Sequence, residues 1–190
     1  IWGYPAGTMA FVLAKFFNKP SILHLQGGDA AGLKKFKYGV FLHPVRRAIC
    51  RYVYNRCTVL IALTKYQVMH LRLAGVVRNI EVIPFGTDTT LFTFQPNRFK
   101  TPAVQFLHVG NLTPIKNQRM LLKTFSLVLK NTSAFLTIVG PDYGNGRLVE
   151  LCVDLGIESH VQFSGHQPHN RLPFFYHQAD ILLHTSYYEG

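Results

Sequence analysis

Phe106-Leu-His-Val-Gly110-Asn-Leu-Thr-Pro-Ile-Lys116-Asn is the stretch on which the interpretation of the whole chain depends. A short apolar run ends at Gly110, a polar turn follows, and Lys116 stands where a helix is expected to begin. The first N–H groups of a helix lack partners within the helix and carry a partial positive charge, to which a lysine adds a full one. The stretch therefore predicts a strand, a turn and a helix N-terminus suited to phosphate. An ordinary strand-to-helix connection with a solvated lysine would look the same, so the neighbouring segments must decide.

The sequence after residue 103 repeats this strand, turn and helix pattern. Four apolar runs have the length of buried strands: 104–109, 134–139, 161–163 and 181–184. Helices are expected between them over 117–131, 146–155 and 170–179, the last capped by Asn170. Gly110, Gly140, Gly165 and the loop from Ser186 to Gly190 each lie just past the carboxyl end of a strand. Ligands bind at that carboxyl edge in open parallel sheets, so these residues mark a candidate site.

The first half of the chain shows the same alternation. Strands are expected over 21–25, 58–62 and 80–83, with helices over 8–17, from Pro44 onward, and over 64–75. The helix after Pro44 should bury one face, composed of Val45, Ala48, Ile49, Tyr52 and Val53. Thr64 and Gln67 have the spacing of a capping box. We expect two α/β domains with parallel sheets, 1–93 and 103–190, joined by a polar linker over 94–102.

Composition excludes a disordered chain, because 48% of the residues are hydrophobic and only 15% are charged. The net charge of +11 suits nucleic acid, an anionic membrane surface or phosphorylated small molecules, and equally a basic solvated surface. The positive residues are mostly dispersed, with small clusters at 34–37 and 46–47. Cys50, Cys57 and Cys152 lack metal-ligand spacing and are interpreted as buried thiols in a reducing cytosol.

Both ends of the sequence indicate a part of a longer protein. It begins at Ile1 rather than at a methionine, and it stops at Gly190, shortly after a strand-like run. We expect the isolated part to be inactive and prone to aggregate, because its sheets would lack strands and expose their edges. The apolar stretch over 9–17 is too short to span a bilayer.

Five segments, taken in order, resemble glycosyltransferase family 4: 83–92, 109–116, 138–140, 161–165 and 179–190. The resemblance covers almost the whole chain. It implies the GT-B architecture, in which two Rossmann-like domains with parallel sheets face a cleft, both incomplete here. It also implies a retaining, hexosyltransferase-type enzyme. Such an enzyme moves a sugar from a nucleotide-diphosphate donor to a hydroxyl of a polysaccharide, a lipid-linked glycan or a small glycoside. A cytoplasmic location is expected, with peripheral contact at the inner face of an anionic membrane, and so is a role in polysaccharide biosynthesis.

The same resemblance implies roles for individual residues. Lys116 matches the lysine that neutralises the donor diphosphate, and Glu189 matches the first glutamate of a Glu-x7-Glu pattern beside the donor sugar, so both are predicted to be catalytic. The predicted donor-binding residues are Gly110, Asn111, Lys116, Gly140, Gly165, His166, Ser186, Glu189 and Gly190. The predicted acceptor-side loop is Gln26, Gly27, Gly28 and Asp29. No cofactor and no metal are expected, because neither an Asp-x-Asp motif nor a His/Cys cluster appears.

Two residues depart from the family pattern. Asn111 stands where arginine is usual and brings no charge to the diphosphate, and Gln26 stands where histidine is usual and cannot carry out acid–base chemistry. A non-catalytic nucleotide-sugar-binding relative is therefore an alternative, as is a nucleotide-sugar epimerase or phosphorylase-like enzyme of the same architecture. A dehydrogenase is disfavoured because no Gly-x-Gly-x-x-Gly follows a strand. A nucleic-acid partner is disfavoured because the basic residues are dispersed.

Overall fold

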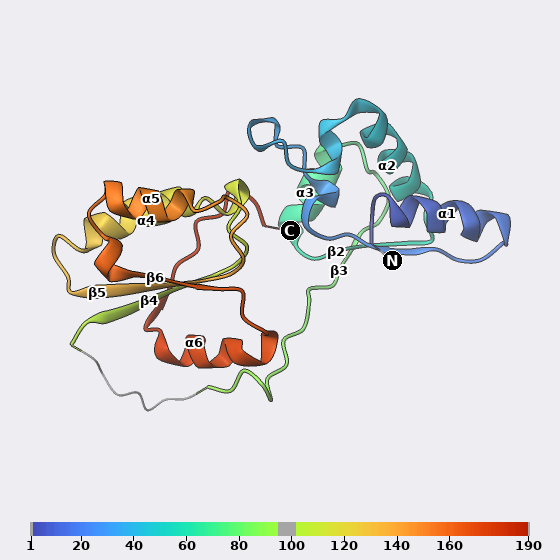
Figure 1. Ribbon diagram of the computed structural model, residues 1–190. Coiled ribbons are helices and arrows are strands. Elements are labelled where there is room, and N and C mark those ends of the chain that lie inside the picture. The colour runs from blue at the N-terminus through green and yellow to red at the C-terminus, as the bar shows by residue number, and fades with distance from the viewer. Residues whose placement is uncertain (1, 95–101, 190) are drawn as a thin grey trace. The chain divides into compact units, whose positions relative to one another are not determined.

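The computed structural model describes residues 2–94 and 102–189, and the chain divides into two compact units. The first unit ends at Gly86 and also includes Glu189, and the second runs from Thr87 to Tyr188. Each unit is built on a parallel sheet with helices packed against it, as the sequence predicts (Figure 1). The division falls between residues 86 and 87, and most of the expected linker over 94–102 lies outside the described residues.

The first unit contains a three-stranded sheet in the order β1-β2-β3. Its strands are β1 (Ile22–His24), β2 (Val59–Ala62) and β3 (Glu81–Val82), and its helices are α1 (Ala6–Phe16), α2 (Pro44–Arg56) and α3 (Lys65–Leu73). Three short 3-10 turns connect β1 to α2: Gly27–Ala30, Lys34–Phe36 and Val40–Leu42. Both strand pairs are parallel, with Leu23 opposite Leu60 and Ala62 opposite Val82.

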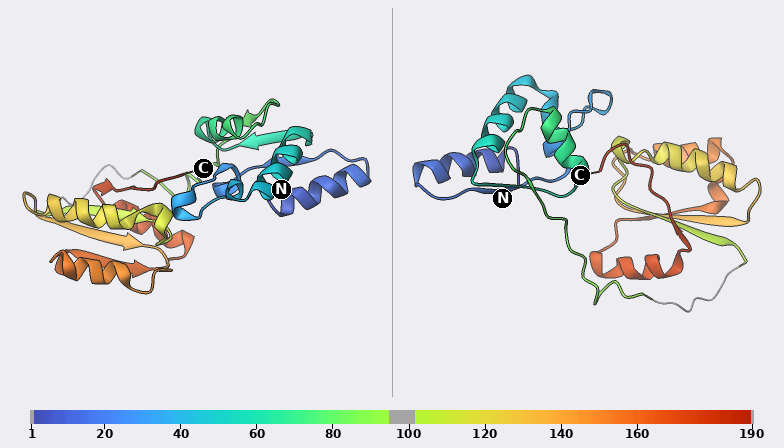
Figure 2. Two further views of the ribbon diagram at one scale, coloured as in Figure 1. Left: turned by 90° about the horizontal axis from the view of Figure 1, so that it is seen from above. Right: turned by 180° about the vertical axis from the view of Figure 1, so that it is seen from behind.

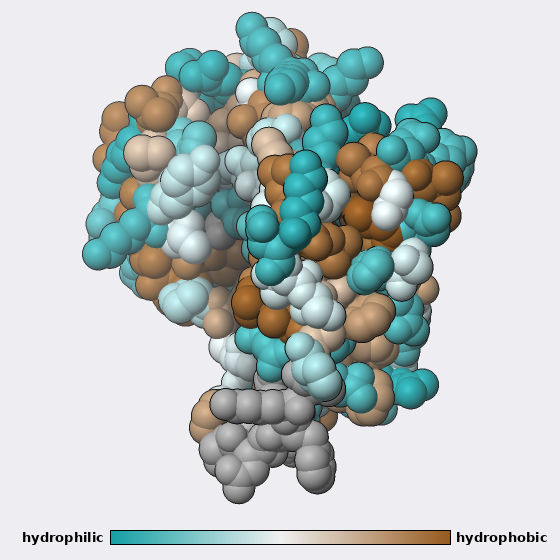
Figure 3. Space-filling view, turned by 90° about the vertical axis from the view of Figure 1, so that its left-hand side faces the viewer, coloured by the Kyte–Doolittle hydropathy of each residue, from teal (hydrophilic) through white to brown (hydrophobic). Residues whose placement is uncertain are grey.

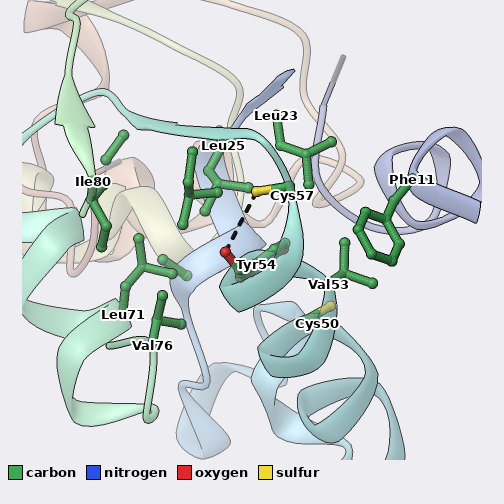
Figure 4. Close-up of a cluster of buried hydrophobic side chains, with 13 residues drawn as sticks. Phe11, Leu23, Leu25, Cys50, Val53, Tyr54, Cys57, Leu71, Val76 and Ile80 are labelled. Atoms are coloured by element: carbon green, nitrogen blue, oxygen red, sulfur yellow. Dashed lines mark hydrogen bonds between the residues drawn. The ribbon is translucent and has the colours of Figure 1, made fainter. Parts of the chain in front are cut away.

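The core of the first unit lies where α2 and α3 pack against one face of this sheet (Figure 4). Figure 4 shows Leu25 on the side of Leu71 of α3 and Leu23 on the side of Phe11 of α1, with Tyr54 of α2 in the same cluster. Leu23, Leu25, Tyr54 and Leu71 are less than 2% exposed. Cys57 follows α2, and its thiol donates a hydrogen bond to the carbonyl oxygen of Tyr54 (3.4 Å). The three cysteines of the chain are buried and free, in agreement with the thiols expected from the sequence.

The buried face of α2 differs from the one predicted. Val45 is 71% exposed and Tyr52 58% exposed, while the packed residues of the helix are Cys50, Val53 and Tyr54. Several apolar stripes overlap on this helix, so apolar spacing alone did not select the correct one. The selection depends on tertiary contacts, because the Tyr54 hydroxyl donates to the buried carbonyl oxygen of Asp29 (3.3 Å).

The predicted capping box at the start of α3 forms in part. The hydroxyl of Thr64 accepts a hydrogen bond from the amide of Gln67 (3.1 Å), as expected. The reciprocal contact goes one residue further back, because the side-chain oxygen of Gln67 accepts from the amide of Leu63 (2.8 Å) rather than from Thr64. Gln67 is fully buried, so this contact satisfies a backbone donor inside the core.

The second unit contains a four-stranded parallel sheet in the order β6-β5-β4-β7. Its strands are β4 (Val104–Val109), β5 (Ala134–Val139), β6 (Val161–Gly165) and β7 (Ile181–Leu182). Its helices are α4 (Gln118–Val128), α5 (Arg147–Asp154) and α6 (Leu172–Gln178), with 3-10 turns at Pro114–Lys116, Glu158–His160 and His169–Arg171. Figures 1 and 2 show α4 and α5 side by side on one face of the sheet and α6 on the other. The core lies between β4, β5 and the helices α4 and α5, and its members Leu121, Phe125 and Leu136 are no more than 1% exposed.

Two details of the second unit differ from expectation. Asn170 does not cap α6, because it lies within the 3-10 turn and the helix begins at Leu172 with no side-chain cap. The 3-10 turn supplies backbone contacts of its own, with the amide of Arg171 donating to the carbonyl of Pro168 (2.9 Å). The last strand is also shorter than the predicted 181–184, because only Ile181 and Leu182 pair with β4.

Residues 88–93 pack within the second unit, although the sequence suggested that they close the first domain. The carboxylate of Asp88 accepts from the amides of Thr90 (2.9 Å) and Leu91 (3.3 Å), which forms a tight turn. The ring of Phe92 then contacts the rings of His169 and Tyr176. This segment is therefore fixed against α6 and the turn before it.

Large apolar side chains are also exposed. Figure 3 shows apolar residues interspersed with polar ones on the face that it displays. On α1, Met9, Val12 and Phe16 are each more than half exposed.

Among the described residues, no helix has both the length and the apolar character that a membrane span requires.

Candidate functional site

The carboxyl ends of three adjacent strands in the second unit form a row of glycines. The amide of Gly110, after β4, donates to the carbonyl of Val139 at the end of β5 (2.9 Å). The amide of Gly140 in turn donates to the carbonyl of Gly165 at the end of β6 (2.8 Å). The sheet thus keeps its hydrogen bonding up to its edge, and it places Gly110, Gly140 and Gly165 side by side.

Gly140 is the position in this row where only glycine fits. Its φ is +148°, and a Cβ built there would lie 2.0 Å from the carbonyl oxygen of Gly110. A side chain would therefore push the ends of β4 and β5 apart. Gly165 also has a positive φ, of +63°, but open space surrounds its missing Cβ. Backbone is consequently accessible at the end of β6, where His166 follows and is exposed.

Lys116 lies between this row and the beginning of α4. It ends the 3-10 turn, and Asn117 then adopts a left-handed conformation (φ 55°) that lets α4 begin at Gln118. A Cβ added at Gly110 would lie 4.0 Å from Cε of Lys116, so the side chain of the half-buried lysine lies close to the first glycine of the row. The first N–H groups of the eleven-residue helix α4 and the lysine charge are therefore near one another.

The loop after β7 is bound to the same turn. The hydroxyl of Thr185 contacts the carbonyl oxygens of Lys116 and Asn117 (3.1 Å each), and the amide of Tyr187 donates to the carbonyl of Ile115 (2.8 Å). Between them, the hydroxyl of Ser186 lies 3.0 Å from Nε2 of His184. The loop that carries Ser186 and the turn that carries Lys116 are thus in direct contact, although these two predicted donor-binding residues are 70 positions apart in the sequence.

Two buried polar residues beneath the turn were not assigned to the site by the sequence. His108 on β4 is 0% exposed and Gln118 on α4 is 3% exposed. Nδ1 of His108 lies 3.0 Å from the carbonyl oxygen of Leu183, and its Nε2 lies 3.2 Å from Nε2 of Gln118. The same amide of Gln118 donates to the carbonyl oxygen of Asn111 (3.0 Å). The only sequence signal was a histidine and a glutamine at positions whose spacing indicates burial.

The remaining predicted donor-side residues are placed as follows. The side chain of Asn111 is exposed, while its carbonyl oxygen faces Gln118. Glu189 is exposed and is grouped with the first unit rather than with Lys116. Gly190 lies outside the described residues.

The acceptor-side loop follows β1 in the first unit, and its acid is turned into the fold. Asp29 is 7% exposed. Its carboxylate accepts hydrogen bonds from the amides of Gly3 (3.0 Å), Tyr4 (3.3 Å) and Gln26 (3.0 Å). Burial raises the pKa of Asp29, and the three backbone hydrogen bonds oppose that effect in part. Gln26, Gly27 and Gly28 are partly exposed.

The second unit's edge brings together a lysine and the N-terminus of a helix, groups that suit an anion. Among the described residues, no cluster of three His, Cys, Asp or Glu side chains could bind a metal ion. The edge lies at the carboxyl ends of parallel strands, where open α/β sheets bind ligands. Fold and edge together place the chain among the α/β proteins with open parallel sheets.

The family follows from the sequence comparison. The model of the family described as "Glycosyl transferases group 1" matches residues 90–190, which is more than half of the chain. The protein therefore belongs to the glycosyl transferases group 1 family. A comparison with curated proteins gave no match.

Solved structures with similar folds are glycosyltransferases. Sucrose-phosphate synthase of Thermosynechococcus elongatus is 18% identical, with a TM-score of 0.84 over 99% of this chain and 50% of that one. HepE of Anabaena, in complex with UDP and glucose, is 19% identical, with a TM-score of 0.76 over 95% of this chain and 50% of that one. A variant of TarM of S. aureus, bound to Fondaparinux, alpha-GlcNAc-glycerol and UDP, is 17% identical, with a TM-score of 0.73 over 93% of this chain and 35% of that one. The chain spans about half the length of the first two, and the likeness establishes a fold of the GT-B type.

Proposed function

We propose that the full-length protein is a retaining glycosyltransferase of family 4, which moves a hexosyl group from a nucleotide-diphosphate sugar to a hydroxyl acceptor. The observation that carries the proposal is the edge of the second sheet, where Lys116 lies close to Gly110, the first of three glycines at the strand ends, beside the start of α4. Negative charge develops on the diphosphate as the sugar leaves. Fixed positive groups at that position stabilise the transition state. Family membership and the UDP-bound neighbours support the same reaction.

Each residue of the edge has a proposed role. Lys116 neutralises the diphosphate, and the backbone at Gly110, Gly140 and Gly190 approaches the phosphates and the sugar. Gly165 and His166 contact the nucleobase, Ser186 contacts the diphosphate, and Glu189 contacts the donor sugar. Asn111 contributes a hydrogen bond where arginine is usual. No resident metal is needed in this scheme, so activity should persist when divalent cations are chelated.

The direct experiment is a transfer assay on the full-length protein. Uridine, guanosine and adenosine diphosphate sugars would be supplied with candidate acceptors, and release of the nucleoside diphosphate would be measured. Nuclear magnetic resonance of the product would report the anomeric configuration, with retention expected. Inverted product would rule out the retaining mechanism, and absence of transfer and of donor hydrolysis from every donor would contradict the enzyme.

A non-catalytic nucleotide-sugar-binding relative is the second candidate, and a structural observation favours it. The exposed side chain of Asn111 supplies no positive charge, and Asp29 of the acceptor-side loop uses its oxygens on backbone amides. Donor binding with no turnover would identify this alternative. Replacing Asn111 with arginine should then strengthen donor binding, because a second charge would face the diphosphate.

The acceptor is proposed to be lipid-linked, with the protein at the inner face of an anionic membrane. The turn from Leu33 to Tyr38 is closed by two mutual backbone hydrogen bonds (2.9 and 3.2 Å) and exposes Lys34, Lys35 and Lys37 together. Clustered lysines are attracted to anionic lipid surfaces. Sedimentation with phosphatidylglycerol vesicles, but not with phosphatidylcholine vesicles, would support this placement. Loss of that sedimentation is expected when all three lysines are changed to glutamine.

A further inference from the structure

The polar pair His108 and Gln118 is buried under the turn that carries Lys116, and neither residue reaches the surface. Burying polar groups is costly unless every donor and acceptor finds a partner. This pair finds partners on two separate segments, the carbonyl of Asn111 on the turn after β4 and the carbonyl of Leu183 on the loop after β7. We infer that His108 and Gln118 are positioning residues, which fix the turn over 110–117 and the loop over 183–187 in the arrangement that binds the donor diphosphate.

The hydrogen-bonding roles in the pair follow from chemistry. The carbonyl oxygen of Leu183 can only accept, so Nδ1 of His108 must carry the proton. In the neutral ring Nε2 then accepts, and it accepts from the amide nitrogen of Gln118. The second hydrogen of that amide goes to the carbonyl of Asn111. Reversing the amide would set its oxygen against two acceptors, so the arrangement has one satisfied orientation.

The consequence for the turn is that its backbone is held from both sides. The carbonyl of Asn111 is directed inward to Gln118, and the next amide, that of Leu112, donates to the carbonyl of Pro141 (3.0 Å). On the other side, Thr185 contacts the carbonyls of Lys116 and Asn117. The buried pair and Thr185 therefore hold the two segments as one body. A site prepared in this way spends little free energy on ordering itself when a ligand binds.

The inference rests on the proposed function for its ligand, but its structural half can be tested without a ligand. In the full-length protein, Gln118→Met keeps the size of the side chain and removes both hydrogen-bond donors. Gln67→Met is the matched control, because Gln67 is equally buried and lies in the first turn of α3, in the first unit. Hydrogen exchange measured by mass spectrometry would follow the amides over 110–117 and those of β4 and β5.

We expect Gln118→Met to speed exchange over 110–117 by roughly tenfold, the loss expected when one buried hydrogen bond is removed, with β4 and β5 protected as before. Gln67→Met should leave that segment unchanged. Binding of inorganic pyrophosphate, measured by calorimetry, should weaken by roughly tenfold in Gln118→Met only. His108→Asn keeps a donor for Leu183 and removes the acceptor for Gln118, so its effect should lie between wild type and Gln118→Met.

The outcomes separate the two ideas. Unchanged exchange over 110–117 in Gln118→Met would overturn the positioning role, and so would unchanged pyrophosphate affinity in a variant of a wild type that binds. If the wild type binds neither pyrophosphate nor uridine diphosphate while the turn still responds to Gln118→Met, the positioning of the turn stands and the donor function fails. Equal responses to Gln67→Met and Gln118→Met would reduce the pair to ordinary core residues.

Discussion

The two sheets of this protein end in loops that use their polar groups in opposite ways. After β1, the acid of the Gln26–Asp29 loop is buried and accepts three backbone hydrogen bonds, so it serves the fold. After β4, β5 and β6, the loops are held by backbone hydrogen bonds and by a buried pair beneath them. Lys116 and Ser186 are left partly exposed. The charged group of the first edge is buried, and that of the second edge is partly exposed.

This difference indicates which edge is prepared for an anion. A carboxylate buried among backbone amides is already satisfied, and moving it would leave those amides without partners. Lys116, by contrast, is partly exposed and lies close to Gly110, beside the start of α4. The following variants test the contrast.

Gly140→Ala should have the largest effect. The added Cβ would meet the carbonyl oxygen of Gly110 at 2.0 Å, at a φ of +148°. We expect the second unit to lose about 3 kcal/mol of its free energy of unfolding, measured by urea denaturation. The matched control is Gly156→Ala, which has a positive φ of +64° but open space around the Cβ, so about 1 kcal/mol is expected. Equal losses would show that the close approach of β4 and β5 is unimportant.

Lys116→Ala should reduce donor turnover by the full-length protein by about a hundredfold, the usual result of removing one preorganised electrostatic contact. Lys123→Ala on the exposed side of α4 is the control, with an unchanged rate expected. The measurement is kcat with the nucleotide sugar that the transfer assay identifies. An unchanged rate in Lys116→Ala would show that the lysine does not contribute to turnover, and it would contradict the proposed difference between the two sheet edges.

Asp29→Asn should destabilise the first unit by about 1–3 kcal/mol at neutral pH, because an amide cannot accept all three backbone hydrogen bonds. Chemical denaturation of the variant and the wild type would measure the difference.

The difference in stability between wild type and Asp29→Asn should depend on pH. Burial raises the pKa of Asp29 in the folded protein above its ordinary value of 3.8. The folded state therefore binds the proton more tightly than the unfolded state, and stability from this group is gained as pH falls through the raised pKa. The advantage of wild type over Asp29→Asn should grow from about pH 7 toward pH 4. An advantage that shrinks over this range would mean that the backbone hydrogen bonds outweigh burial.

The smallest effects concern helix starts. Thr64→Ala should cost about 1 kcal/mol, because the hydroxyl caps α3, whereas Asn170→Ala should change stability by less than about 0.5 kcal/mol, because Asn170 caps nothing. Thermal unfolding of both variants would compare them. A larger loss in Asn170→Ala would contradict the observed start of α6.

Much of the fold could be predicted because it depends on local patterns. Strands β4 and β5 have the predicted bounds, 104–109 and 134–139, since continuous apolar runs ending at glycines have few other solutions. Where two solutions were compatible with the pattern, the sequence did not select between them. The packed face of α2 was wrongly predicted because several apolar stripes compete, and the cap at Asn170 was wrongly predicted because a 3-10 turn replaced it.

The candidate site, too, could be predicted from the sequence only in part. Gly110, Gly140, Gly165 and Lys116 could be found because strand ends and the turn after β4 are visible in the sequence, and the family then named the ligand class. The roles of these residues, and of Glu189 and the Gln26–Asp29 loop, stay predictions.

The sequence by itself determined the two parallel α/β units, the glycines at the ends of β4, β5 and β6 and the lysine before α4, because each depends on neighbours along the chain. The tertiary structure alone decided which polar groups are buried and hydrogen-bonded within the fold. The carboxylate of Asp29 accepts hydrogen bonds from residues 25 and 26 positions away. Gln118 contacts His108 and the carbonyl of Asn111 on the turn after β4, and Thr185, from the loop after β7, contacts the same turn. Such contacts depend on segments that meet only after folding, so no local pattern records them.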